Sequence, residues 1–117
     1  MRRSLRAALA LGAIAVGAVP EAGAQVLAAA QLFTMPGKGN CIACHQVPAG
    51  AGPATRADLG PRLEGARMRA LGASALKALI ADPTVANPDT LMPPFGRHRI
   101  LDAGEIDRLV KYLLALP

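Results

Sequence analysis

The sequence predicts a small all-α domain, and three observations lead to that prediction. Three stretches of the 117-residue chain repeat their apolar residues at the spacing of a helix. No stretch shows the apolar–polar alternation of a half-buried strand, and no segment is repeated. The only two cysteines lie in one motif, Cys41-Ile42-Ala43-Cys44-His45. These observations favour one helical domain built around the motif.

A secretory signal peptide is expected in front of the domain. Met1–Arg6 is basic, Ala7–Val19 is an apolar run of 13 residues, and Ala22–Ala24 fits a small-residue cleavage site. The run falls short of the ~20 residues that a membrane-spanning helix needs, although a retained anchor stays open. We therefore expect cleavage to remove residues 1–24 and leave residues 25–117 as the domain. The mature form would have no membrane span and would be periplasmic.

The expected cleavage also changes the charge of the protein. The chain has a net charge of +5, of which the signal peptide carries +2, so the mature domain would carry +3. No stripe of basic and aromatic residues accompanies this charge, and we expect no nucleic-acid partner. The chain has one Tyr, two Phe and no Trp, so a domain this small needs a staple beyond its apolar core.

Two short helices are expected in the first two thirds of the domain. Val26–Phe33 consists of good helix formers with its apolar residues on one face, and the turn-forming residues of Met35–Asn40 end it. Ser74–Ala81 carries an apolar stripe, with Ser74 as its expected N-cap. Pro83 stops that helix, because proline disfavours a helical residue before it.

The third expected helix, Asp102–Leu116, has the strongest pattern in the chain. Asp102 and Glu105 form an acidic variant of the capping box at its start. Between the three helices we expect loops at Gln46–Asp58 and Thr84–Thr90. The apolar face of the third helix consists of Ile106, Leu109, Val110, Leu113 and Leu114.

The Cys41–His45 motif has the spacing of a c-type haem attachment site. Each thiol would add to one vinyl group of the porphyrin, and His45 would reach the iron as proximal ligand. Two other interpretations stay open. A redox-active disulfide favours a βαβ context that this chain lacks, and a closed zinc site needs about four ligands. We expect one covalent haem c, held by Cys41 and Cys44.

The iron also needs a sixth ligand or an open position, and three later residues are candidates. Met92 lies 47 residues after His45 and precedes two prolines, whose fixed backbone would hold a weak thioether ligand in place. Met68, between two arginines, is expected at the surface or partly in the core, and His98 is expected at the surface. We therefore predict His45 and Met92 as the metal ligands. Two filled axial positions favour electron transfer over peroxide chemistry.

The order of helix, short loop and haem motif resembles class I cytochromes c. In that family the first and last helices cross near the haem edge, often with an aromatic residue such as Tyr112 at the crossing. A Gly-Pro-x-Leu-x-Gly stretch, matched here by Gly60–Gly65, lies beside the proximal histidine. The resemblance implies a class I cytochrome c-like domain wrapped around one haem. It also implies that the Pro61 carbonyl accepts a hydrogen bond from His45.

A narrower resemblance covers nearly all of the expected mature chain. Thr84–Leu101, which contains the string Met-Pro-Pro-Phe-Gly-Arg-His-Arg-Ile-Leu, and Gly39–His45 resemble SoxX. SoxX is the monohaem cytochrome subunit of the SoxAX complex of sulfur-oxidising bacteria. The resemblance implies the electron-transfer subunit of a heteromeric L-cysteine S-thiosulfotransferase. We expect no catalytic residue on this chain, because in that complex the catalytic centre lies on SoxA and both cysteines here serve the haem.

The SoxX resemblance implies three partners. A SoxA-like haem subunit would form a heterodimer with the chain. A SoxYZ-like carrier would dock transiently, and its cysteine would be joined oxidatively to thiosulfate. An acceptor cytochrome c would receive the released electrons. The alternatives are a free-standing diffusible monohaem cytochrome c and, if the sixth position is open, a haem sensor or peroxidase.

Overall fold

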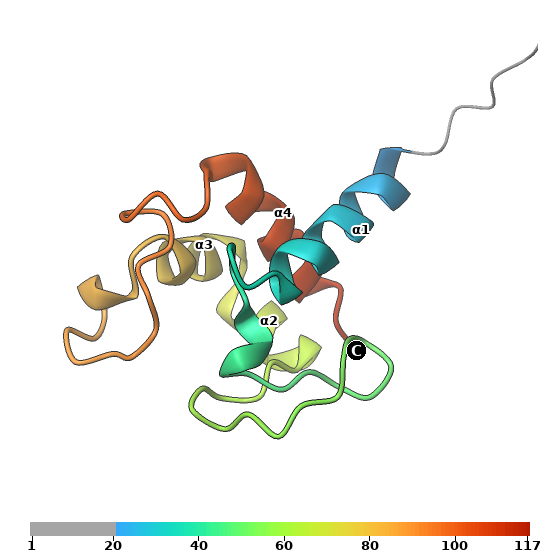
Figure 1. Ribbon diagram of the computed structural model, residues 1–117, viewed down its shortest axis with the longest axis horizontal. Coiled ribbons are helices and arrows are strands. Elements are labelled where there is room, and N and C mark those ends of the chain that lie inside the picture. The colour runs from blue at the N-terminus through green and yellow to red at the C-terminus, as the bar shows by residue number, and fades with distance from the viewer. Residues whose placement is uncertain (1–20) are drawn as a thin grey trace, which may run out of the picture.

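The computed structural model describes residues 21–117, with side chains described from residue 28 onward, and it is helical (Figure 1). No strand occurs within residues 21–117, so the expected all-α class is confirmed. None of the helices in this range combines the length and the apolar character that crossing a membrane requires. The elements are α1 (Glu21–Thr34), η1 (Cys41–Ala43), α2 (Gly65–Leu71), α3 (Ala73–Ala81), η2 (Pro83–Val85) and α4 (Ala103–Leu114).

The first and last helices, α1 and α4, pack side by side, as the resemblance to class I cytochromes c implied (Figure 1). Phe33 of α1 and Tyr112 of α4 meet with their ring centroids 5.3 Å apart and their planes tilted by 52°, a favourable arrangement for aromatic pairs. Ala29 is fully buried, and its small side chain lets the helices approach closely. The Tyr112 hydroxyl donates to the carbonyl of Ala51 at 2.7 Å, which ties the loop after the haem motif to this crossing.

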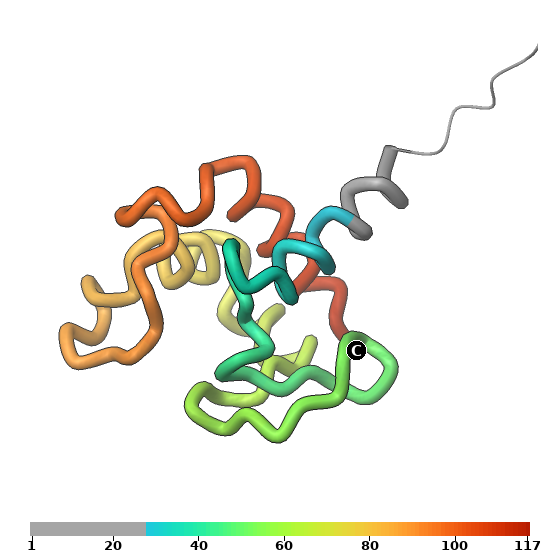
Figure 2. Tube along the Cα trace, viewed as in Figure 1, coloured from blue at the N-terminus to red at the C-terminus, as the bar shows by residue number. Residues whose placement is uncertain are grey.

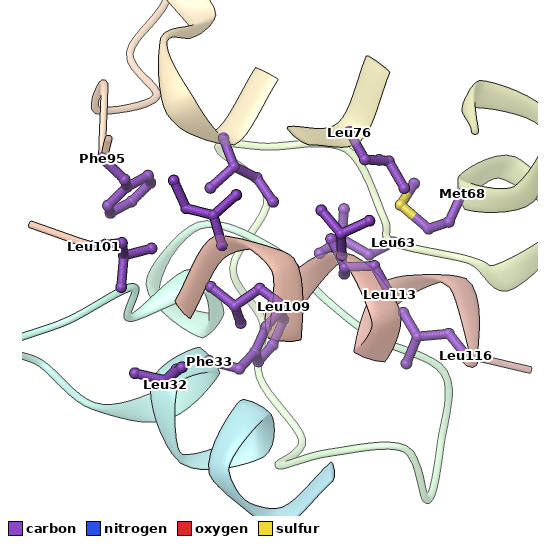
Figure 3. Packing of buried hydrophobic residues seen from close by; sticks show 13 residues of the cluster. Leu32, Phe33, Leu63, Met68, Leu76, Phe95, Leu101, Leu109, Leu113 and Leu116 are labelled. Atoms are coloured by element: carbon purple, nitrogen blue, oxygen red, sulfur yellow. The ribbon is translucent and has the colours of Figure 1, made fainter. Parts of the chain in front are cut away.

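The apolar core surrounds α4. Figure 3 shows Leu109 and Leu113 of α4 between Phe33 of α1 and Leu76 of α3. The expected apolar face of α4 is thus buried, apart from Leu114, which is partly exposed. The buried cluster consists of Leu32, Phe33, Leu63, Met68, Leu76, Ile80, Phe95, Leu101, Ile106, Leu109, Val110, Leu113 and Leu116.

The capping box at the start of α4 is confirmed. The Glu105 N–H donates to Asp102 Oδ1 at 2.7 Å, and the Asp102 N–H donates to Glu105 Oε2 at 3.0 Å. Lys38 adds a contact that the sequence pattern does not contain, because its Nζ lies 2.8 Å from Glu105 Oε1. The turn before the haem motif is therefore joined to the N-terminus of α4.

Three helical elements were not predicted, and the first of them is η1 within the haem motif. Helix α2 lies in a segment with no assigned structure, and η2 interrupts the expected Thr84–Thr90 loop. Helix α2 docks against the end of α4, where Arg69 Nη1 donates to the Leu116 carbonyl at 2.8 Å. The Gly65 N–H donates to the Pro117 carbonyl at 2.7 Å. These contacts join residues that are far apart in the sequence, so no local sequence pattern predicts α2.

The predicted N-cap of α3 is wrong. Ser74 lies inside the helix, and the cap position is held by Gly72, whose φ of 80° is a left-handed conformation that glycine adopts without strain. Gly72 also ends α2, so one glycine separates two helices. Loops occupy residues 46–64 and 86–102, which include the expected Gln46–Asp58 loop (Figure 2).

Replacing Glu105 by Gln should reduce the loss of stability in acid. The hydrogen bond from Lys38, followed by that from the Asp102 N–H, lowers the pKa of Glu105 below its usual 4.5. A carboxylate of this kind contributes stability that is fully present above its unfolded pKa and is lost as pH falls through the lower folded pKa. Denaturant unfolding should thus show a smaller stability difference between about pH 7 and about pH 3 in E105Q than in the wild type.

The exposed Glu64 provides the control for this experiment. Its carboxylate lies 3.5 Å from Arg62 and its side chain is 59% exposed, so E64Q should keep the acid dependence of the wild type. Equal acid dependence in E105Q and the wild type would contradict the role given to the Lys38–Glu105 contact.

Replacing Gly65 by Ala should destabilise the fold, although alanine is the better helix former. A Cβ at this position would overlap the Leu116 carbonyl. Overpacking of this kind costs about 1–3 kcal/mol, which should appear as a lower midpoint of denaturant unfolding. G37A is the matched control, because a Cβ on Gly37 meets no atom within 4 Å. Equal unfolding midpoints for G65A and G37A would mean that the close packing of α2 against the end of α4 does not contribute to stability.

Candidate functional site

A cavity of about 790 Å³ opens between the haem motif, the core helices and the loop that contains Met92. This volume lies in the range of about 300–1,000 Å³ that small-molecule and cofactor sites occupy. The four predicted site residues Cys41, Cys44, His45 and Met92 all line it. Much of the remaining wall is core side chains, several of which Figure 3 shows around α4.

The haem motif forms a tight turn that presents both thiols to the cavity. Asn40 enters the turn in the left-handed conformation at φ 44°, and η1 then starts at Cys41. In a 3₁₀ helix, side chains three residues apart lie on one face, which matches the spacing from Cys41 to Cys44. The N–H groups of Cys44 and His45 both donate to the Cys41 carbonyl, at 3.1 and 2.9 Å. The turn thus places two thiols and one imidazole on the same wall.

His45 is held by the contact that the resemblance implied. Its Nδ1 lies 2.7 Å from the carbonyl oxygen of Pro61. A carbonyl oxygen only accepts, so Nδ1 carries the proton and donates. The other ring nitrogen, Nε2, then has a free lone pair, which is the state a metal ligand requires. The ligand role of His45 itself stays a prediction.

Gly60 lies directly against the His45 ring. A Cβ on Gly60 would overlap three ring atoms of the imidazole, so no larger residue fits while the ring keeps this place. The Gly60 N–H also donates to the Cys44 carbonyl at 2.8 Å. Glycine at this position is therefore explained by the close approach of the loop to the proximal side of the site.

Gln46, next to the proximal histidine in the chain, makes contacts with the loop beside the site that sequence reasoning missed. Its backbone carbonyl accepts from the Leu63 N–H at 2.9 Å, and its Nε2 donates to the Ala57 carbonyl at 2.8 Å. Its Oε1 accepts from Arg62 Nη1 at 2.8 Å. A single glutamine beside a histidine gives no pattern from which these contacts could have been found.

The two other interpretations of the cysteines find no support in the structure. Burial is the main cause that raises the pKa of Cys41 to about 12, whereas a redox-active C-x-x-C cysteine needs a lowered pKa. Within the described part of the chain, no three residues among His, Cys, Asp and Glu cluster so as to hold a metal ion. A closed zinc site needs about four such ligands.

The three candidates for the distal position lie in different surroundings. Met92 is partly buried on the cavity wall, and its N–H donates to Thr90 Oγ1 at 3.1 Å. Met68 also reaches the cavity, but it is 2% exposed and belongs to the core, so the surface option for it is wrong. His98 is exposed, as expected, and does not line the cavity.

These residues fit a covalent haem. The cavity offers apolar walls for the faces of the porphyrin and two thiols on one side. It also offers an imidazole with the required tautomer and a thioether on the loop around Met92. An all-α fold with this set of groups defines a c-type cytochrome, a class whose function is electron transfer.

The comparison with protein families supports this class. Residues 23–113 match the family described as "Cytochrome C oxidase, cbb3-type, subunit III". The chain belongs to this family of cytochrome c domains, which implies covalent haem c. No curated protein matches the chain. The narrower resemblance to SoxX, the cleavage of residues 1–24 and the periplasmic location stay predictions.

Replacing each methionine on the cavity wall by leucine should identify the distal ligand. Leucine nearly conserves the volume of methionine but lacks the sulfur. M92L should lower the reduction potential and allow the reduced protein to bind carbon monoxide, because the sixth position loses its ligand. M68L should do neither. Visible spectra with and without carbon monoxide, together with redox titration, measure both effects. The reverse result would make Met68 the ligand.

Proposed function

We propose that this chain is the electron-transfer subunit of a SoxAX-type complex in the periplasm, with one haem c. It would work beside a SoxA-like haem subunit, receive a SoxYZ-like carrier transiently and deliver electrons to another cytochrome c. Joining thiosulfate to a cysteine thiolate forms one S–S bond and releases two electrons. A bound haem c supplies a one-electron change at iron, so this chain would accept the electrons one at a time.

The chain's own residues have a limited task in this reaction. Cys41 and Cys44 would hold the porphyrin covalently, and His45 and Met92 would fill the two axial positions. Pro61 fixes the proton of His45 on Nδ1. No further cysteine is available to react with sulfur, so the catalytic centre of the thiosulfotransferase would belong to the partner.

The observation that supports a permanent partner is the apolar rim of the cavity. Exposed Leu59, Leu71 and Leu91 line the cavity, and exposed Val85 directly precedes Ala86, which also lines it; these four residues form the apolar rim. Leu91 is 81% exposed and Val85 83%, and Val85 does not line the cavity, so a bound haem alone would not cover it. Apolar groups gathered at a rim mark an interaction site.

The alternative is a free-standing diffusible cytochrome, which should have a ring of charge around the haem edge for transient docking. The charged residues on the cavity wall are Lys38, Arg67 and Asp89, and Lys38 is already bonded to Glu105. Such a sparse and mixed set fits a buried interface better than electrostatic steering. The matched family is named after an oxidase subunit, so an oxidase is a further partner to test.

Co-purification from the native host tests the proposal. The chain, tagged at its C-terminus, is isolated after growth with thiosulfate, and the bound proteins are identified. A stoichiometric second haem polypeptide, with haem reduction that depends on thiosulfate, is the expected result. A haem-containing monomer that oxidases or reductases turn over would indicate the diffusible carrier. A haem–copper oxidase as partner would indicate the oxidase assignment.

Placing a carboxylate on the apolar rim should disrupt the complex, and V85E, which lies outside the cavity wall, should do so without loss of haem. In V85E or L91E an unpaired charge would be buried by the partner, at a cost of several kcal/mol, so association should weaken by roughly 100-fold or more. A54E, on the exposed loop after the haem motif and outside the cavity wall, is the control. The amount of partner retained on the tagged chain measures the effect, and equal retention in all three variants would contradict the rim as interface.

A further inference from the structure

Gln46 is bonded to three points of the loop that returns to the haem motif. Its backbone carbonyl binds the Leu63 N–H, and its side-chain amide binds the carbonyl of Ala57 and the guanidinium of Arg62. These three points lie on both sides of Pro61, the residue whose carbonyl receives the proximal imidazole proton. Gln46 therefore contacts the loop both before and after Pro61, the residue that accepts the hydrogen bond from His45.

We propose that Gln46 is a positioning residue for the haem centre. Its side chain holds the Pro61 carbonyl at hydrogen-bonding distance from His45, and so adjusts how strongly the imidazole donates to the iron. The inference rests on the haem c assignment within the proposed function, and not on the identity of the partner.

The loop has few other means of fixing that carbonyl. Residues 46–64 contain no helix, so no regular backbone ladder holds them. The Gly60 N–H is bonded to the Cys44 carbonyl, one residue before Pro61. After Pro61, the bonds nearest to the proximal site are those from Arg62 and Leu63, and both go to Gln46. The bond from the Leu63 N–H goes to the Gln46 backbone, whereas the Gln46 side chain binds the Ala57 carbonyl before Pro61 and the Arg62 guanidinium after it.

The electronic consequence follows from the role of the hydrogen bond. A firm bond from Nδ1–H to a carbonyl increases the basicity of the ring and its donation to the metal. Greater donation stabilises the oxidised iron, which carries more positive charge, and lowers the reduction potential. A looser bond should have the opposite effect. A change at Gln46 should therefore shift the potential upward without altering any residue that contacts the iron.

The first experiment compares Q46M with Q31M in the haem-loaded protein alone. Methionine keeps the length of glutamine but removes its amide. Gln31 is exposed on α1, and its side chain makes no hydrogen bond within the described residues, so Q31M is the matched control. Redox titration should give a more positive potential for Q46M only. The Nδ1 proton of His45, followed by NMR, should exchange about fivefold faster, as for the loss of one hydrogen bond of ordinary net strength.

R62M removes the same hydrogen bond by replacing Arg62 instead of Gln46. It tests the proposal even if Q46M does not take up haem. It removes the bond between Arg62 and Gln46 and the ion pair between Arg62 and Glu64 but keeps the bond to Ala57. The reference is R56M, which removes one positive charge from the same loop, and relative to R56M the shift in potential should have the same sign as in Q46M and be smaller. The double variant should shift the potential no further than Q46M, because the two residues share one bond.

One outcome would overturn the proposal. In that outcome Q46M and R62M lower the free energy of unfolding, but the reduction potential and the exchange rate of the His45 Nδ1 proton stay at wild-type values. Gln46 would then only anchor the loop. Absence of a haem spectrum in the unsubstituted protein would instead count against the haem assignment. Failure of the Gln46 proposal and failure of the haem assignment are therefore distinguishable.

Discussion

The hydrogen bond between His45 and Pro61 is the interaction on which the proximal side of the site depends. It fixes the tautomer of the imidazole, and it also requires the loop of residues 46–64 to return to the haem motif. That return requires glycine at position 60, because the ring lies against the backbone there. Two backbone bonds, Gly60 to Cys44 and Leu63 to Gln46, then hold the segment in place. The His45–Pro61 contact and these two backbone bonds thus hold the end of the loop against the haem motif.

Helix α4 supplies side chains to the apolar wall of the site. Leu109 and Leu113 belong to the core cluster and also line the cavity, so the walls of the site and the core of the domain are the same side chains. Folding and haem binding are therefore coupled, because the haem would supply apolar contacts that a domain this small lacks. The Lys38–Glu105 contact extends this coupling to the turn that leads into the haem motif.

The sequence predicted those features whose causes are local. The capping box and the apolar face of α4 both depend on residues three or four positions apart. Helix α2 was not predicted, because it is held by contacts with Leu116 and Pro117, which lie far away in the sequence. Met68 was expected partly at the surface because arginines flank it, yet its side chain fills the core. Flanking charge says little about the one face of a short helix that points inward.

The same distinction explains why the class of the protein is clear from its site while its partner needs an experiment. Cavity, thiols, imidazole and thioether are set by this chain alone, and they suffice for electron transfer. In the proposed function, partner choice would depend on the apolar rim, which includes exposed Val85 and Leu91. Apolar side chains give affinity for a surface of matching shape but little selectivity by charge, so they suit a partner that stays bound. A carrier that must dock and leave many times per second would gain more from charged groups at these positions.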